Sequence, residues 1–191
     1  MHEEYLQQAR DCLSNSGVLA YPTEAVYGLG CVPQATAAIE RILNLKQRPV
    51  TQGMILVAAD FSQLEDYVEI SACRDTTEIL ASWPGPVTWI MPATELVPVG
   101  IKSDDDTVAV RVSACQDVIE LCRLAGAIVS TSANPKGLEP ARSHLEVEKY
   151  FQDAIDYIVP GEIVNSASVS EIRNAITGEI IRSGNKSMKS T

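Results

Sequence analysis

Histidine is scarce in this sequence, and the five cysteines show no C-x-x-C pair. His2 and His144 are far apart and lack partner ligands, which argues against a zinc site. An odd number of cysteines without paired spacing is typical of thiols that pack as small apolar residues in a reducing compartment. The sequence therefore favours neither a zinc site nor a disulfide-stapled scaffold.

Long apolar runs are also missing, because no stretch approaches the ~20 residues needed to span a bilayer. The N-terminus has no basic region followed by an apolar one, as a secretory signal would. We therefore expect a cytoplasmic protein. Positive charge is scarce too: 15 Lys and Arg against 25 Asp and Glu give a formal net charge of −10. Any contact with RNA or a nucleotide then needs a local basic cluster.

With 191 residues, 46% of them apolar, the chain can form one full core. We expect a single domain over residues 1–184 and a polar tail over 185–191. Apolar spacing predicts helices over 3–15, 36–47, 62–68, 75–82, 115–124 and 144–152. Apolar runs and alternation predict strands over 17–21, 54–59, 87–92, 107–113, 127–131, 156–159, 168–173 and 178–182. The irregular order indicates an α+β fold, with a mixed sheet covered by helices in three layers.

Polar side chains gather in segments at the ends of apolar runs, where a rigid element can aim them. They bring hydroxyls, an amide, two arginines and a lysine. Such a set suits a polyanion such as a nucleotide better than it suits hydrolytic acid–base chemistry. The segments are residues 21–30, 46–49, 83–88, 108–112 and 130–134.

Lys46 continues the apolar stripe that Ile39 and Ile42 begin on their helix, and Arg48 follows just before Pro49. Two cations at a helix end can clamp a phosphate or a carboxylate. The alternative is ordinary capping of the helix C-terminus by basic residues. This segment alone does not decide between them.

The hydroxyls of residues 130–132 and the amide of Asn134 follow a buried strand, where they could hold phosphate or ribose oxygens or simply form a turn. Arg111 lies on the polar side of its strand, so it either pairs with a carboxylate or faces a cavity. Glu24 is a candidate acid or a candidate partner for a cation.

In this order, the motifs resemble those of the YrdC-like family, in its short bacterial form, over about residues 7–184. The matching segments are Tyr-Pro-Thr-Glu-Ala-Val-Tyr-Gly-Leu-Gly, Lys-x-Arg-Pro, Trp-Pro-Gly-Pro-x-Thr, Val-Ala-Val-Arg, Ser-Thr-Ser-Ala-Asn, Ser170-Glu-Ile-Arg173 and Ile181-Arg-Ser-Gly184. The resemblance implies a three-layer α+β domain with a twisted mixed β-sheet, flanked by helices around a concave, positively lined cleft.

The resemblance also implies a nucleotidyltransferase reaction. L-threonine and bicarbonate or CO2 give N-carboxythreonine, whose new carboxylate attacks the α-phosphate of ATP. The products are threonylcarbamoyl-AMP and pyrophosphate, with Mg²⁺ bridging the phosphates and no metal motif in the protein. A partner complex then transfers the threonylcarbamoyl group to the adenosine beside the anticodon of tRNAs that read ANN codons. A weak contact with tRNA in the cleft is a further implied partner interaction.

Carried onto this sequence, the family's site assigns the catalytic role to Lys46 and Arg48. The implied ATP-binding residues are Lys46, Arg48, Thr88, Ser132, Asn134 and Arg182. The implied threonine-binding residues are Thr23, Ser130, Thr131 and Ser170. Arg111 and Arg173 are expected in the cleft without an assigned role.

The sequence departs from longer members of the family at three positions around the substrates. Ala25 replaces a second threonine, Gln52-Gly53 replaces Asn-Pro, and Val57 replaces a histidine. Threonine recognition is therefore expected to use other groups or water. The additional C-terminal domain of the long form is absent from this sequence.

Three other functions are alternatives to the implied nucleotidyltransferase reaction. One is an RNA-binding module, for double-stranded RNA or tRNA, that aids ribosome maturation. The acidic charge and the scarcity of aromatic residues argue against a broad RNA surface. A sugar-phosphate lyase would need clustered acidic and histidine ligands. A partner protein without catalysis would not need the cations and hydroxyls. Release of pyrophosphate from ATP distinguishes the synthase from a binding module.

Overall fold

A computed structural model describes residues 1–163 and 170–184 of the chain. The expected tail, residues 185–191, lies outside the described residues, as do the first two residues of the strand predicted over 168–173. All five cysteines are free. No helix in the described part of the chain has the length and apolar character that a membrane crossing requires.

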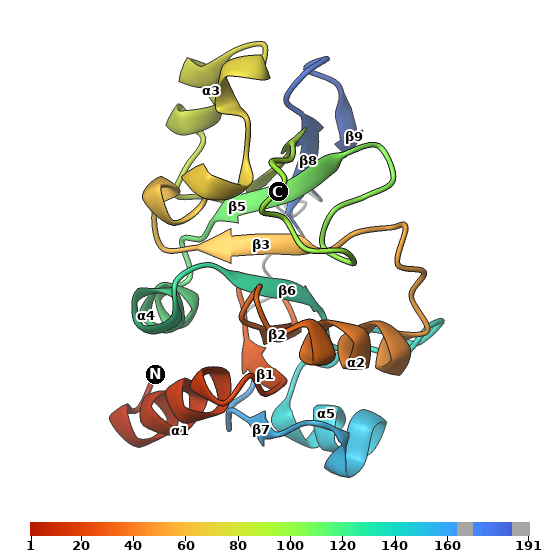
Figure 1. Cartoon of the computed structure of the whole chain (residues 1–191). Coiled ribbons are helices and arrows are strands. Elements are labelled where there is room, and N and C mark those ends of the chain that lie inside the picture. Colours follow the sequence, from red (N-terminus) through yellow and green to blue (C-terminus); the bar gives the residue numbers. More distant parts are fainter. Residues whose placement is uncertain (164–169, 185–191) are drawn as a thin grey trace, which may run out of the picture.

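The helices and strands mix along the chain as the sequence predicts (Figure 1). The α-helices are α1 (Glu3–Ser14), α2 (Thr36–Lys46), α3 (Thr76–Ala81), α4 (Gln116–Ala125) and α5 (His144–Phe151). Short 3-10 helices cover Phe61–Gln63, Glu65–Tyr67, Ile70–Ala72 and Gln152–Ala154. The strands are β1 (Leu19–Pro22), β2 (Tyr27–Cys31), β3 (Ile55–Ala58), β4 (Val87–Pro92), β5 (Thr107–Val112), β6 (Ile128–Ser132), β7 (Tyr157–Ile158), β8 (Glu171–Asn174) and β9 (Ile180–Arg182).

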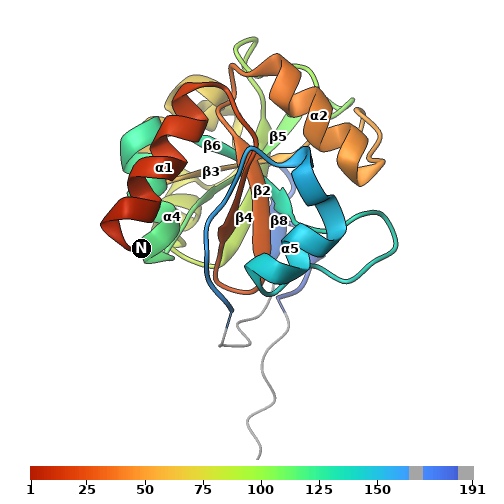
Figure 2. The same cartoon turned by 90° about the horizontal axis from the view of Figure 1, so that it is seen from below.

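All these strands form one mixed sheet in the order β7-β1-β2-β6-β3-β5-β4-β8-β9. The pairs β1–β7, β3–β5 and β4–β8 are parallel, and the other neighbours are antiparallel. Helices α1 and α4 lie on one side of the sheet and α2 and α5 on the other (Figure 2). The expected three-layer α+β architecture is therefore confirmed.

The buried apolar side chains form two clusters, one on each face of the sheet, because successive side chains of a strand point to opposite faces. Leu19, Val57 and Ile128 pack with α1 and α4, whereas Ala20, Leu56 and Val129 pack with α2 and α5. We call the face that carries Leu19, Val57 and Ile128 the cavity face, because the helices α1 and α4 cover only part of it.

Strand β2 was not among the predicted strands, because its two glycines read as a turn signal. Its residues are all buried, and both glycines face the ring of Tyr21 on β1. A Cβ on Gly30 would lie 2.4 Å from the carbonyl oxygen of Val129 and 3.0 Å from Cε1 of Tyr21. These glycines therefore leave space for the aromatic ring of Tyr21 on the neighbouring strand.

We expect Gly30→Ala to lower the free energy of unfolding by about 2 kcal/mol, because the new Cβ overlaps a main-chain oxygen that cannot move without shifting β6. Gly28→Ala is the matched control, because the nearest atoms to its Cβ would be side-chain carbons at 3.3 Å. Urea unfolding of both variants tests this difference. Equal stability of the two variants would contradict the packing argument.

Candidate functional site

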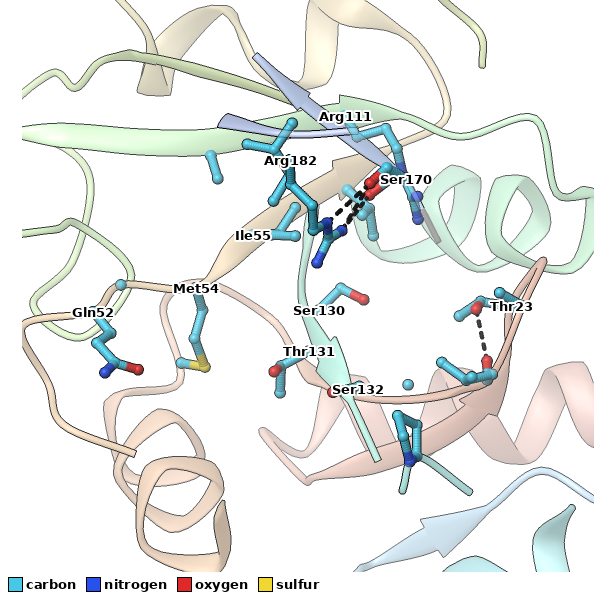
Figure 3. A pocket seen from close by; sticks show the side chains of 18 of the residues that line it. Thr23, Gln52, Met54, Ile55, Arg111, Ser130, Thr131, Ser132, Ser170 and Arg182 are labelled. Atoms are coloured by element: carbon cyan, nitrogen blue, oxygen red, sulfur yellow. Dashed lines mark hydrogen bonds between the residues drawn. The ribbon is translucent and has the colours of Figure 1, made fainter. Parts of the chain in front are cut away.

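A cavity of about 450 Å³ opens on the cavity face, between the β1–β2 turn, strands β3, β5 and β6, and the C-terminal strands (Figure 3). Eight of the residues predicted for the site line it: Thr23, Arg48, Arg111, Ser130, Thr131, Ser132, Ser170 and Arg182. The remaining predicted residues do not line it, and these are Lys46, Thr88, Asn134 and Arg173.

The charge of the lining is positive. Three arginines line the cavity, Arg48, Arg111 and Arg182, whereas Glu24 is the only carboxylate among its described lining residues. Burial lowers the pKa of Arg48 and of Arg182, and the nearby Arg111 lowers that of Arg182 further. Three guanidinium groups with one carboxylate favour an anionic ligand.

Lys46 lies behind the cavity. It is the last residue of α2, which ends because Gln47 adopts a left-handed conformation and Pro49 follows. Its ammonium donates hydrogen bonds to the carbonyl oxygen of Ser132, to that of Asn134 at 3.0 Å, and to Oδ1 of Asn134 at 3.1 Å. Lys46 is therefore the support of the turn after β6, not an open cation at the cavity wall. Burial and the neighbouring Arg48 lower its pKa to about 8.

Hydrogen bonds within the turn after β6 also fix its conformation. The Ser132 hydroxyl donates to Oδ1 of Asn134 at 2.7 Å, and Nδ2 of Asn134 donates to the carbonyl oxygen of Leu138 at 2.7 Å. The hydroxyl of Ser132 lines the cavity while the amide of Asn134 is used by the turn. Asn134 therefore shapes the loop that presents Ser132.

Arg48 uses part of its guanidinium to hold its own loop. Nε donates to the carbonyl oxygen of Gly53 at 2.9 Å and Nη2 to that of Gln52 at 3.1 Å. These bonds fix the direction of the guanidinium, and its remaining N–H groups are available to the cavity.

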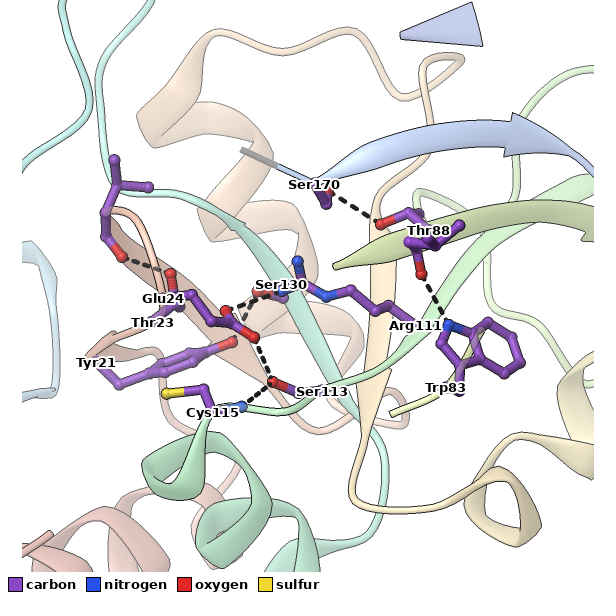
Figure 4. Close-up of polar contacts among 12 residues, drawn as sticks. Tyr21, Thr23, Glu24, Trp83, Thr88, Arg111, Ser113, Cys115, Ser130 and Ser170 are labelled. Atoms are coloured by element: carbon purple, nitrogen blue, oxygen red, sulfur yellow. Dashed lines mark hydrogen bonds and ion pairs between the residues drawn. The ribbon is translucent and has the colours of Figure 1, made fainter. Parts of the chain in front are cut away.

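Arg111 meets Glu24 on the cavity wall (Figure 4). Nη2 of Arg111 lies 3.5 Å from Oε2 of Glu24, and the Ser113 hydroxyl donates to the other carboxylate oxygen at 2.7 Å. The backbone N–H of Cys115 in turn donates to Ser113 at 3.1 Å. Nε of Arg111 is buried and has no hydrogen-bond partner. Glu24 is thus a partner for a cation, and the guanidinium tip of Arg111, which lines the cavity, keeps further N–H groups for a ligand.

Two hydroxyls near Glu24 and Arg111 are also oriented by hydrogen bonds (Figure 4). The fully buried Tyr21 hydroxyl donates to Oγ of Ser130 at 2.8 Å. Thr23 donates to the carbonyl oxygen of Val26 at 2.6 Å, which leaves its lone pairs for a ligand (Figure 3). Ser130 and Thr23 thus face the cavity as a fixed pair of polar groups.

Thr88 was expected to touch the nucleotide, but it is fully buried and its hydroxyl donates to Oγ of Ser170 at 3.1 Å. Arg182 also holds Ser170, donating from Nη2 to its carbonyl oxygen at 2.8 Å. The expectation for Thr88 therefore changes from ligand contact to support of Ser170.

Arg173 was expected in the cleft, and it lies elsewhere. It pairs with Glu171 and Glu78 and stands 5.5 Å from the ring centre of Trp89. The reason is strand alternation: its neighbour Ile172 lines the cavity, so Arg173 points to the opposite face of β8.

The positions where the sequence departs from longer relatives, Ala25, Gln52 and Val57, all line the cavity. Sequence reasoning missed Ser113, and it also missed the hydroxyls of Ser103 and Thr107 at the cavity wall. A single serine or threonine beside a strand gives no signal of its own, because only the sheet register decides whether it faces a site.

The chain is similar to one protein family over most of its length. The Sua5/YciO/YrdC family model, described as "Telomere recombination", matches residues 11–184. Threonylcarbamoyl-AMP synthase from Nitrosococcus oceani is 47% identical over 171 residues, which are 89% of this chain and 92% of the relative. The enzyme of the same name from Hahella chejuensis is 42% identical over 179 residues, 93% of this chain and 97% of the relative.

A solved structure supports the same relationship. Sua5 from P. abyssi, in a crystal structure complexed with L-threonine, superposes with a TM-score of 0.80 at 32% sequence identity. The superposition covers 88% of this chain but 50% of that one. The chain therefore spans about half the length of this structural relative.

Proposed function

This chain belongs to the Sua5/YciO/YrdC family, and we propose that it makes threonylcarbamoyl-AMP and pyrophosphate from L-threonine, bicarbonate or CO2, and ATP. The observation that carries this proposal is the identity of 42% and 47%, over almost the whole chain, to relatives that bear the name of this reaction. The positive cavity supports it, because nucleotidyl transfer depends mainly on stabilising phosphate charge.

The cavity offers each substrate a suitable set of groups. The polyphosphate of ATP is taken by Arg48, Arg182 and the hydroxyl of Ser132, which Lys46 holds in place through the turn. L-threonine is taken at the part of the cavity that Glu24 and Arg111 border. Its carboxylate binds the guanidinium tip of Arg111, and its polar groups meet Thr23 and Ser130. Thr131 and Ser170 also line this region.

ATP enters as its magnesium complex. Glu24, the one carboxylate among the described lining residues, already binds Arg111 and Ser113. Phosphate oxygens and water are therefore the main ligands of Mg²⁺ in this proposal. The product passes to a threonylcarbamoyl-transferase complex acting on tRNA in the cytoplasm. A purely RNA-binding function is not favoured, because a net charge of −10 opposes a broad RNA-binding surface.

The proposal is tested by pyrophosphate release from ATP by the purified chain in the presence of Mg²⁺. We expect release only when both L-threonine and bicarbonate are present. Omission of each substrate in turn is the control. RNA binding without any threonine-dependent release would instead support a binding module.

The affinity for ATP is expected to fall as the pH rises from 7 to 9. The buried Lys46 has a pKa of about 8, so its ammonium is mostly charged at pH 7 and mostly neutral at pH 9. Loss of this charge leaves two N–H groups for three acceptors, which weakens the hold on Ser132, and it weakens the field at the phosphates; together these lower the affinity by up to about tenfold. Titration calorimetry at pH 7, 8 and 9 measures this change.

Two further observations separate Lys46 from other groups. Lys46→Arg keeps the charge throughout this range and should flatten the pH dependence. The stability of the unliganded chain should change in the opposite direction. Because the pKa of Lys46 is lowered on folding, its contribution becomes more favourable as the pH rises above about 8. An affinity that is equally pH-dependent in Lys46→Arg would assign the effect to another group.

A further inference from the structure

Glu24 stands out because it is the single carboxylate among the described lining residues of a cavity with three arginines. It is held firmly on one side only. The Ser113 hydroxyl donates to Oε1 at 2.7 Å, whereas Arg111 lies 3.5 Å from Oε2, at the outer limit of a hydrogen bond (Figure 4). Oε2 therefore retains capacity to accept a hydrogen bond from a ligand.

The pair of Glu24 and Arg111 is complementary to an α-amino acid. An α-amino acid carries an ammonium and a carboxylate on one carbon, so its receptor needs an anion and a cation side by side. Arg111 supplies a guanidinium that lines the cavity, and Glu24 supplies the neighbouring carboxylate. The hydroxyls of Thr23 and Ser130 are lining groups of the same cavity.

We propose that Glu24 binds the α-ammonium of L-threonine and takes its proton, so that the amine can attack bicarbonate. This inference rests on the proposed function and adds to it a residue that acts before the nucleotide reacts. An ammonium has no free electron pair, so it must lose a proton before it can form the new C–N bond. No other described carboxylate lines the cavity.

Threonine ammonium and bicarbonate give N-carboxythreonine, one water and one proton. One proton of the ammonium passes to Glu24, and the freed electron pair of the nitrogen forms the bond to the carbon of bicarbonate. The C–OH bond breaks, and the hydroxide leaves as water with a second proton from the nitrogen. Glu24 then releases its proton to solvent. With CO2, the same two protons leave the nitrogen and no water forms.

The support of Glu24 is built to fix its carboxylate. Ser113 follows β5 and accepts a hydrogen bond from the backbone N–H of Cys115, which precedes α4. The serine hydroxyl hydrogen is thereby directed at Oε1 of Glu24. The carboxylate is oriented from behind, and its other oxygen is directed toward Arg111 and the cavity.

The test separates the two halves of the reaction in Glu24→Gln, which keeps the shape and the hydrogen bond from Ser113. The forward reaction, from L-threonine, bicarbonate and ATP, includes the proton transfer and should slow about 100-fold. In the reverse step, ATP formation from threonylcarbamoyl-AMP and pyrophosphate, pyrophosphate attacks the α-phosphate and breaks its mixed anhydride bond to the carbamate oxygen before any proton must reach nitrogen. That rate should remain within about threefold of the wild-type rate.

Glu78→Gln is the matched control, because Glu78 also pairs with an arginine, Arg173, but lies outside the cavity lining. It should leave both directions unchanged. Equal slowing of both directions in Glu24→Gln would overturn the proposal and leave Glu24 as a support of Arg111. A forward rate equal to the wild-type rate would overturn it as well. Absence of forward reaction in the wild type would instead defeat the proposed function.

Discussion

Replacing Lys46 with Ala is expected to lower turnover about 10³-fold, because a charged group behind the phosphate site and its three hydrogen bonds are lost together. The ammonium ties the end of α2 to the turn that carries Ser132 and Asn134. Without it, three oxygens lose their common donor, and Ser132 is no longer held against the cavity. Steady-state pyrophosphate release, with ATP and L-threonine varied in turn, measures the loss.

Two variants separate this role from simple helix capping. Lys149 also lies in the last turn of its helix, α5, and Lys149→Ala removes a cation there without touching the cavity. Its activity should match the wild type. Lys46→Met keeps the length of the side chain and guards against collapse of the helix end. Full activity in Lys46→Met would contradict the role of the charge.

Local patterns were sufficient for most of the fold. The predicted strand over 87–92 coincides with β4, and the helix predicted over 36–47 differs from α2 by one residue. Both depend on side-chain spacing within a short segment, which the sequence displays directly. Strand β2 could not be predicted in this way, because its glycines are explained by the space that the ring of Tyr21 needs on the neighbouring strand. That contact is not visible in the local sequence.

The site was harder to predict than the fold, because its contacts join distant segments. The stripe on α2 indicated that Lys46 lies in the interior or at a cleft, and its side chain is indeed buried. That its ammonium binds carbonyl oxygens more than 80 residues away depends on how α2 docks against β6. The positions of Thr88 and Arg173 similarly follow from the register of β4 and β8.

Glu24 and Arg111 illustrate the same limit. The sequence identified each as a candidate partner for an opposite charge, but nothing linked two residues that lie 87 positions apart. The fold brings them together, because the β1–β2 turn, which carries Glu24, and β5, which carries Arg111, border the same cavity. On β3, the strand next to β5, Val57 lies beside Arg111. The small side chain of Val57 is buried and carries no charge. Arg111 is therefore the residue of this pair that can bind a charged group of the substrate.

Replacing Arg111 with Ala is expected to lower kcat/KM for L-threonine about 10³-fold, while KM for ATP changes by no more than about threefold. The guanidinium is largely buried, its Nε has no protein partner, and it lies against Glu24. Its loss removes the receptor for the substrate carboxylate and leaves Glu24 without its cation. Initial rates at saturating ATP, with L-threonine varied, give the effect.

The contrast between arginines makes this prediction specific. Arg111→Lys should rescue little, because an ammonium cannot offer the two parallel N–H groups that a carboxylate accepts from a guanidinium. Arg173→Ala should stay within about twofold of the wild type, because Arg173 binds Glu171 and Glu78 on the opposite face of the sheet. A rise in KM for ATP, with that for L-threonine unchanged, would instead assign Arg111 to the phosphates. The assignment of Arg111 to L-threonine and of Arg48 and Arg182 to the phosphates would then be wrong.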